Sequence, residues 1–210
     1  MRKMIVPAII AESQRGLEER IARVREHLSL FQLDVMDGRF VPNHSLDFDL
    51  TLPDGLQFEA HLMVEEPERW IEQNCDRVDT VLAHVESCED PERIIRLVKG
   101  RRRIGFALNP ETPLSRVTPY LDEVDQVLVM TVNPGSYGSP FLPKMLTKVS
   151  QLRRLKPSLN IEVDGGINAK TIGQVNDAGA DMFVSGSYIV NADDVGAAVR
   201  KLKKLLGQEV

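Results

Sequence analysis

The sequence of 210 residues predicts a single-domain α/β protein with the (β/α)8 TIM-barrel fold, extending over residues 1–210. Short apolar runs alternate with amphipathic segments along the whole chain, which is typical of parallel α/β proteins. There are eight such runs, and the length is close to the lower limit of about 200 residues for this barrel. No GxGxxG turn follows the first run, so a dinucleotide-binding open sheet has no support.

Each predicted strand is short, and turn or polar residues bound it. The predicted strands are residues 4–10, 30–36, 57–63, 80–85, 104–108, 126–132, 160–164 and 182–185. Helices are predicted at residues 17–28, 67–75, 91–99, 141–155, 171–178 and 194–206. The second crossover is short and contains Pro53, so we expect its helix to be abbreviated or replaced by a loop.

The composition is that of an ordinary soluble globular protein, with 42% hydrophobic and 27% charged residues. The net charge of −5 argues against a nucleic-acid partner, which normally requires a basic face. Cys75 and Cys88 stand in no zinc or disulfide pattern, which fits a reducing compartment. No apolar run is long enough to span a membrane or to form a signal peptide, so we expect a cytoplasmic protein without a membrane partner.

Polar side chains lie at or just past the ends of the predicted strands, where TIM barrels place their chemistry. They are Asp34, His61, His84, Asn109, Asn133, Asp164 and Ser187. We expect them to converge around one mouth. The alternation of a strand directs Asp34, His61 and Asp164 into the barrel, together with Gln32, Met36 and Met63.

Asp34 lies within an apolar run, where a carboxylate needs a cation or metal as partner. One imidazole and two carboxylates, from His61, Asp34 and Asp164, could bind Zn, Mn or Fe(II). A hydrogen-bonded cluster is the alternative. The two aspartates could also serve as acid and base on opposite faces of one carbon, as an epimerisation requires. Structural carboxylates that cap loops would explain them equally well.

Glycines follow three predicted strands, where barrels often bind phosphate with backbone amides. They are Gly135 and Gly138, then Gly165 and Gly166, and finally Gly186 before Ser187. Turns also use glycine for its conformational freedom, which is the alternative explanation. Met36, Met63 and Met130 either pack in the core or form an apolar wall that excludes water. We interpret His84 and Glu86 as a hydrogen-bonding pair.

Several stretches resemble the ribulose-phosphate 3-epimerase family, in family order and over nearly the whole chain. They are LDVMDGRFVPN at 33–43, HLM at 61–63, HVE at 84–86, LNPETP at 108–113, MTVNPG at 130–135, EVDGG at 162–166 and SGS at 185–187. The resemblance implies a TIM-barrel isomerase that interconverts D-ribulose 5-phosphate and D-xylulose 5-phosphate through a metal-stabilised enediolate.

The resemblance also implies roles for individual residues. Asp34 and Asp164 would be the acid/base pair and metal ligands, and His61 a further ligand. Met36, Met63 and Met130 would form a wall around the enediolate. The phosphate and substrate would contact Ala8, His61, Gly135, Gly138, Gly165, Gly166, Gly186 and Ser187. The expected cofactor is a divalent ion (Zn, Fe(II), Mn or Co) with no organic cofactor, and the chain is expected to form a homo-oligomer with a phosphorylated ketose as substrate.

The departures from the family pattern lie in the expected active site. Gln32 stands where the family has a fourth, histidine ligand, so weaker metal binding or a shift toward harder ions is expected. Ala8 replaces a serine, and residues 136–139 read SYGS where the family usually has FGGQ in the loop over the substrate. Two other functions therefore remain open. One is an epimerase for another ketose phosphate such as allulose 6-phosphate, and the other is a sugar-phosphate-binding relative that has lost its metal.

Overall fold

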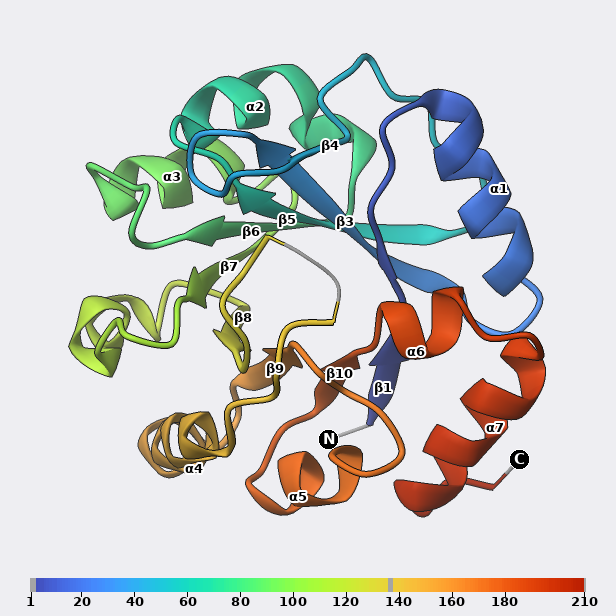
Figure 1. Ribbon diagram of the computed structural model, residues 1–210. Coiled ribbons are helices and arrows are strands. Elements are labelled where there is room, and N and C mark those ends of the chain that lie inside the picture. Colours follow the sequence, from blue (N-terminus) through green and yellow to red (C-terminus); the bar gives the residue numbers. More distant parts are fainter. Residues whose placement is uncertain (1–2, 136–137, 210) are drawn as a thin grey trace.

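The strands form a barrel with helices around it, as the sequence predicts (Figure 1). The computed structural model describes residues 3–135 and 138–209. In hydrogen-bonding order the strands are β1, β10, β9, β8, β7, β6, β5, β3 and β2, and every pair on this path is parallel. The bounds are Met4–Val6 (β1), Ala8–Ile9 (β2), Leu30–Asp37 (β3), Gln57–Met63 (β5), Thr80–His84 (β6), Arg103–Leu108 (β7), Gln126–Met130 (β8), Asn160–Asp164 (β9) and Met182–Val184 (β10).

The barrel closes where the first predicted strand divides in two at Pro7. Strand β1 pairs with β10, and β2 pairs with β3 on the other side. Pro7 has no N–H to donate to the sheet. Its carbonyl accepts from the Gln32 N–H at 3.0 Å, and the Val6 carbonyl accepts from the Ser185 N–H at 2.8 Å. Residues 4–9 therefore join the two ends of the strand path.

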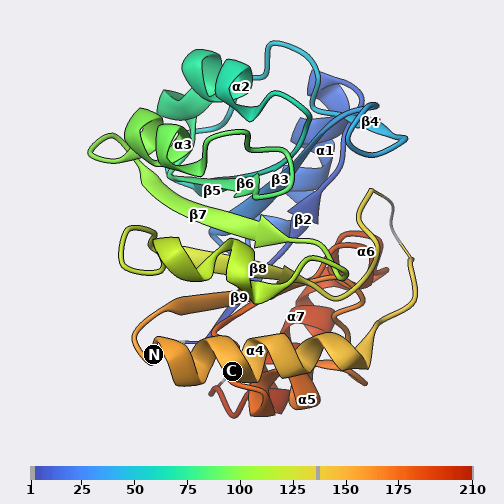
Figure 2. The ribbon, with the colours of Figure 1, turned by 90° about the vertical axis from the view of Figure 1, so that its left-hand side faces the viewer.

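The helices lie outside the ring of strands (Figures 1 and 2). Their bounds are Gln14–Val24 (α1), Pro67–Asn74 (α2), Pro91–Val98 (α3), Leu146–Leu155 (α4), Ile172–Asp177 (α5), Ser187–Val190 (α6) and Val195–Leu205 (α7). Helix α1 begins before the predicted residue 17 because the Ser13 hydroxyl caps it, accepting from the Gly16 N–H at 3.3 Å. None of the described helices is long and apolar enough to cross a bilayer.

Two crossovers lack an α-helix among the described residues. After β3 the chain forms only the short antiparallel strand β4, His44–Ser45, before a loop leads to β5. The expected loss of the second helix is thereby confirmed. Between β7 and β8 the chain forms two 3₁₀ helices, Leu114–Arg116 and Thr118–Tyr120. Helix α4 is shorter than predicted because a 3₁₀ turn, Pro143–Met145, precedes it.

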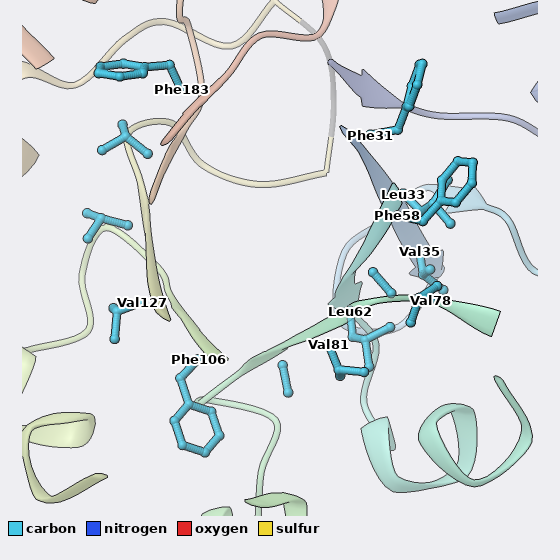
Figure 3. Close-up of a cluster of buried hydrophobic side chains, with 14 of the residues drawn as sticks. Phe31, Leu33, Val35, Phe58, Leu62, Val78, Val81, Phe106, Val127 and Phe183 are labelled. Atoms are coloured by element: carbon cyan, nitrogen blue, oxygen red, sulfur yellow. The ribbon is translucent and has the colours of Figure 1, made fainter. Parts of the chain in front are cut away.

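The main core lies between the strands and the outer helices. Phe31, Leu33 and Val35 alternate along β3 and are at most 3% exposed. Figure 3 shows these and other labelled side chains directed away from the barrel axis. Because alternate strand residues face opposite sides, Gln32, Asp34 and Met36 face the interior. The outer face thus forms the main core, while the inner face carries polar groups together with smaller apolar clusters such as that of Leu82, Ala107 and Leu128.

Candidate active site

Asp34, His61 and Asp164 each direct one ligand-type atom to a common point inside the barrel. The three atoms all lie within 4.8 Å of one another. His61 Nδ1 is 3.1 Å from Asp34 Oδ1 and 3.5 Å from Asp164 Oδ2. The side chains come from β5, β3 and β9, and residues 34 and 61 are register partners across neighbouring strands. The strand alternation therefore brings together the three residues that the sequence places on the inner face.

A chain of hydrogen bonds holds the far side of the His61 ring. His61 Nε2 lies 2.9 Å from His84 Nε2, and His84 Nδ1 lies 3.1 Å from Glu86 Oε2. Burial lowers the pKa of His84 to about 4, so this ring is neutral at pH 7. The neutral His84 ring donates its one N–H, at Nδ1, to the Glu86 carboxylate. Its Nε2 atom is then an acceptor for the N–H of His61. His61 is thereby oriented with Nδ1 toward the two aspartates.

Gln32 lies at the same point as the three ligand-type atoms. Its Nε2 atom is 2.7 Å from Asp34 Oδ1, 2.8 Å from Asp164 Oδ2 and 3.3 Å from His61 Nδ1. Its Oε1 atom is buried and has no hydrogen-bond partner among the described residues. The sequence places Gln32 where the family has a histidine ligand, and its carbonyl oxygen would be the atom able to bind a metal there. Instead, the structure directs the amide nitrogen toward the aspartates.

The charges in this cluster shift the pKa values of its members. Burial, and next the charge of Asp34, raise the pKa of Asp164 to about 7. Burial alone would lower the pKa of His61, but its hydrogen bond to Asp34 and the two aspartate charges outweigh burial and raise it. Asp164 is therefore partly protonated near neutral pH. Such a group can both give and take a proton under physiological conditions.

A cavity of about 600 Å³ opens above the two aspartates. Its wall includes the three methionines expected there from the sequence, Met36, Met63 and Met130. The predicted contact residues that line it are Ala8, Gly135, Gly138, Gly165, Gly166, Gly186 and Ser187. Gln32 and His61 are fully buried and are not among the lining residues. The site thus has a polar floor beneath an accessible chamber.

Two adjacent glycines after β9 form one side of the cavity, and the backbone requires glycine at both positions. Gly165 has φ +117° and Gly166 has φ +68°. A Cβ atom on Gly165 would lie 2.9 Å from the Val132 backbone nitrogen, and one on Gly166 would lie 2.9 Å from Phe141 Cβ. Larger side chains would therefore displace neighbouring segments. Because both residues lack a side chain, the backbone of Gly165 and Gly166 itself lines the chamber.

Comparison with known sequences decides the family. The sequence profile described as the ribulose-phosphate 3 epimerase family matches residues 4–190. The chain belongs to the ribulose-phosphate 3-epimerase family. Relatives named ribulose-phosphate 3-epimerase include those of Schizosaccharomyces pombe (36% identity, covering 95% of this chain and 92% of that protein) and Aquifex aeolicus (35%, 97% and 97%). The relative of Bacillus subtilis is 34% identical, over 95% of this chain and 97% of that protein.

Solved structures agree on the barrel architecture. A crystal structure of KGPDC from Streptococcus mutans superimposes with a TM-score of 0.73 at 15% identity, covering 98% of this chain and 97% of that one. Orotidine 5'-phosphate decarboxylase from Pyrococcus horikoshii gives 0.65 at 16% identity, covering 98% and 100%. At such identities the similarity establishes the fold alone. The epimerase family assignment rests on sequence.

For an epimerase family member, the donor set of this site fits a divalent ion. Two carboxylates and one imidazole converge, and the other nitrogen of that imidazole is held by His84, as is usual for metal-binding histidines. Gln32 presents its amide nitrogen to this set, at 2.7 and 2.8 Å from the two aspartates, so the three donors of Asp34, His61 and Asp164 are the ones that could hold the ion. The residues present therefore suit the ion that the family resemblance implies.

The epimerase cavity has lining residues that are not evident from the sequence. They are chiefly Asn168, Lys170, Tyr188 and Lys201. Lys170 lies five residues after Gly165 in the loop that follows β9, so the family motif EVDGG signals its neighbourhood. Lys201 lies on α7, and nothing in the sequence distinguishes it from the other lysines of that helix. Conversely, Asn109 and Asn133 do not line the cavity, contrary to expectation. Ser136 and Tyr137, of the altered loop, lie outside the described residues.

Proposed function

We propose that the chain interconverts D-ribulose 5-phosphate and D-xylulose 5-phosphate by proton transfer at C3. One observation carries this proposal. Asp34 and Asp164 both line the floor of one cavity, and their facing oxygens lie within 4.8 Å of each other. Two carboxylates around one carbon are what an inversion of configuration requires, because one removes the proton and the other returns it to the opposite face. Family membership and the names of the relatives support this substrate.

The two aspartates would exchange roles between the two directions of the reaction. Asp164 would hold a proton at its carboxyl while Asp34 accepts one from the substrate. In the reverse direction Asp164 acts as the base. Because each aspartate must act as the base in one direction and as the acid in the other, both carboxylates are needed at the chamber floor. Met36, Met63 and Met130 would keep water from the enediolate formed between the two proton transfers.

A divalent ion would be held by Asp34, His61 and Asp164, and Zn, Fe(II), Mn and Co all suit these donors. When bound, it would act as a Lewis acid that favours loss of the proton next to a carbonyl. The phosphate of the ketose would lie against Gly166 and the start of α6 at Gly186 and Ser187. The first backbone N–H groups of a helix lack intrahelical partners and can donate to an anion.

A coupled assay tests the proposal. Purified protein is supplied with Zn, Mn, Fe(II) or Co in turn, and xylulose 5-phosphate formation from ribulose 5-phosphate is followed. We expect metal-dependent conversion in the wild type and a loss of about 10²–10⁴-fold in both Asp34→Asn and Asp164→Asn. In D₂O the product should carry deuterium at C3. Equal inactivity of the wild type and both variants with every metal would refute the assignment.

Two alternative functions are tested by the same preparations. The Gln32 amide donates to both aspartates, which favours a sugar-phosphate-binding protein that no longer uses a metal. Such a protein would bind ribulose 5-phosphate in calorimetry without turnover. The changed residues Ala8 and 136–139 favour a different ketose phosphate. A substrate panel that includes allulose 6-phosphate would then show activity where ribulose 5-phosphate does not.

We also propose a cytoplasmic location and a homo-oligomeric state. Cys75 and Cys88 are both buried, free thiols, which suits a reducing compartment. Self-association follows from the family resemblance alone. Light scattering of the purified protein measures the second point directly, and a mass of one chain at all concentrations would contradict it.

A further inference from the structure

Gln32 is hydrogen-bonded in a way that a simple ligand replacement does not explain. Its side chain is fully buried, and its amide nitrogen faces both aspartates at 2.7 and 2.8 Å. A carboxamide NH₂ group has two hydrogens, one for each carboxylate. Gln32 thus bridges Asp34 and Asp164 with a neutral donor group, at the point where the three ligand-type atoms converge.

A third contact of this nitrogen, with His61 Nδ1, is longer at 3.3 Å, and His61 Nδ1 lies 3.1 Å from Asp34 Oδ1. The two shorter contacts, with the aspartates, can use both hydrogens of the Gln32 amide. This arrangement links the buried polar side chains directly to one another.

The other end of the same carboxamide lacks a partner among the described residues. Gln32 Oε1 is buried and accepts no hydrogen bond from them, although buried amide oxygens are normally satisfied. Two other side-chain oxygens inside the barrel are in the same state. Glu59, the register partner of Gln32 on β5, has a buried Oε1 without a partner in the described part of the chain, and so does Glu162 on β9. The interior therefore contains buried oxygens that can accept a further hydrogen bond.

A half-turn about the terminal bond of Gln32 exchanges the positions of its oxygen and nitrogen. Without an ion this turn is unfavourable, because the amide oxygen would face two carboxylate oxygens. With a divalent ion between the aspartates, the amide oxygen would be an attractive metal ligand, and the NH₂ group would take the position that the unpartnered oxygen holds in this structure. The orientation with the nitrogen toward the aspartates therefore suits the site without an ion, and the orientation with the oxygen toward them suits the site with an ion.

We propose that the Gln32 carboxamide is a two-position element, which bridges Asp34 and Asp164 through its nitrogen in the metal-free protein and turns its oxygen toward a bound divalent ion. This inference rests on the proposed function in one respect, since it requires the site to bind such an ion. It makes Gln32 both an internal competitor of the metal and its fourth ligand. Metal binding must therefore break the two hydrogen bonds from the Gln32 amide nitrogen to Asp34 and Asp164. A histidine at this position would not bridge the two carboxylates in this way.

Side-chain NMR and calorimetry on the full chain test the inference together. The ¹⁵N-labelled NH₂ pair of Gln32 is identified by its absence from the Gln32→Glu spectrum, and Zn²⁺ is then added to the metal-free protein. We expect this pair to shift in proportion to the zinc bound, with one ion per chain in calorimetry. The NH₂ pair of Gln14, which is held by Glu18 and the Thr51 carbonyl on the surface, is the reference and should not move.

Two substitutions change the bridge and the ligand in different combinations. Gln32→Leu removes the bridge, which opposes metal binding, and the amide oxygen, which supports it. We expect loss of the oxygen to dominate, so that zinc binds about tenfold or more weakly than to the wild type. It should also melt at a lower temperature without metal. Gln32→His, which supplies imidazole and no bridge between the carboxylates, should bind zinc more tightly than the wild type. Gln126→Leu is the matched control, because Gln126 donates to Glu59 and Glu162 instead, and its zinc affinity should match that of the wild type.

Two results would overturn the inference while leaving a metal-dependent enzyme in place. One is zinc binding by the wild type with an unmoved Gln32 resonance, and the other is tighter binding by Gln32→Leu. Absence of zinc, Mn, Fe(II) and Co binding by the wild type and by Gln32→His would refute the metal requirement itself, and the two-position element with it.

Discussion

His61 Nε2 lies 2.9 Å from His84 Nε2, so a single hydrogen is shared between two imidazole rings buried in the barrel. His84 is in turn held by Glu86, whose other oxygen accepts from the Asn109 N–H at 2.8 Å. Burial alone would raise the pKa of Glu86, but the hydrogen bond from His84 brings it below its ordinary value. Glu86 therefore remains a carboxylate and fixes which nitrogen of His61 faces the aspartates.

Replacing His84 tests this orientation. His84→Phe keeps a ring of similar volume and removes the acceptor for His61, so we expect metal affinity to fall about 10–100-fold. Calorimetry with Zn²⁺ measures the change. Phe40, whose ring lies 4.8 Å from that of His84, provides the control, since Phe40→Leu leaves the hydrogen bonds in place and should bind zinc normally. Normal zinc affinity in His84→Phe would show that His61 needs no partner.

The stability of the metal-free protein should fall as pH rises through neutrality. In the folded chain the pKa of Asp164 is raised to about 7 from its ordinary value near 3.8, so the folded state binds this proton more tightly than the unfolded state. Stability is therefore lost as pH rises between these values. His61, whose pKa is also raised, contributes with the same sign because its stabilising charge is lost at higher pH.

Thermal melts in EDTA between pH 5 and pH 8 measure this dependence. We expect the wild type to lose several degrees of melting temperature over that range, and Asp164→Asn to lose less. Because other buried groups also titrate, the difference between the two proteins is the decisive quantity. Identical slopes would mean that Asp164 is ionised throughout, contrary to its buried position beside Asp34.

Gly166→Ala should weaken substrate binding. The φ of +68° disfavours alanine by about 1–2 kcal/mol, and the added Cβ would press on Phe141 in the cavity wall at 2.9 Å. We expect a raised KM for ketose phosphate and a lower melting temperature. Gly207, with φ +71° and open space around it, is the matched control. Gly207→Ala should lose similar stability with no change in KM, and a changed KM there would refute a local effect.

Lys201 should contribute to binding of the phosphorylated substrate, since it lines the cavity and the ligand carries negative charge. For Lys201→Met we expect KM to rise about two- to fivefold with little change in kcat, as an exposed charge contributes at most about 1 kcal/mol. Added salt should reduce the difference. Lys204→Met, three residues on along α7, is the control and should behave as wild type. A normal KM in Lys201→Met would remove this lysine from the substrate site.

The alternation of eight apolar runs with amphipathic segments was sufficient to predict the barrel. Period-two alternation within the strands was sufficient to predict the inward direction of Asp34, His61 and Asp164, because strand geometry is nearly independent of context. The division of the first strand at Pro7 was not predicted, although proline was visible, since its effect depends on which neighbours the strand pairs with. Helix α1 was misplaced at both ends because apolar spacing marks a helix face rather than its caps.

The chemistry of the site was harder to predict than its location. The identity of Gln32 was known, but the direction of its amide depends on three side chains from three strands. His84 and Glu86 were expected to pair, whereas the contact of His84 with His61 requires the register of β5 and β6. The place of Asn109 after a strand predicts that it lies at the mouth, whereas in the structure its backbone N–H donates a hydrogen bond to Glu86. The position of a residue at a strand end predicts that it lies near the site, but the side-chain rotamers decide which groups it contacts.

The closure at Pro7 has a consequence for synthesis of the chain. Gln32 and Asp164, which meet at 2.8 Å, are 132 positions apart in the sequence. A nascent chain emerging from the ribosome holds Asp34 and His61 long before β9 exists, and the strand path cannot return to β1 until β10 follows. Capture of the proposed ion by all three side chains would therefore be a late event in biogenesis. Partly synthesised chains carry Asp34 and His61 without Asp164.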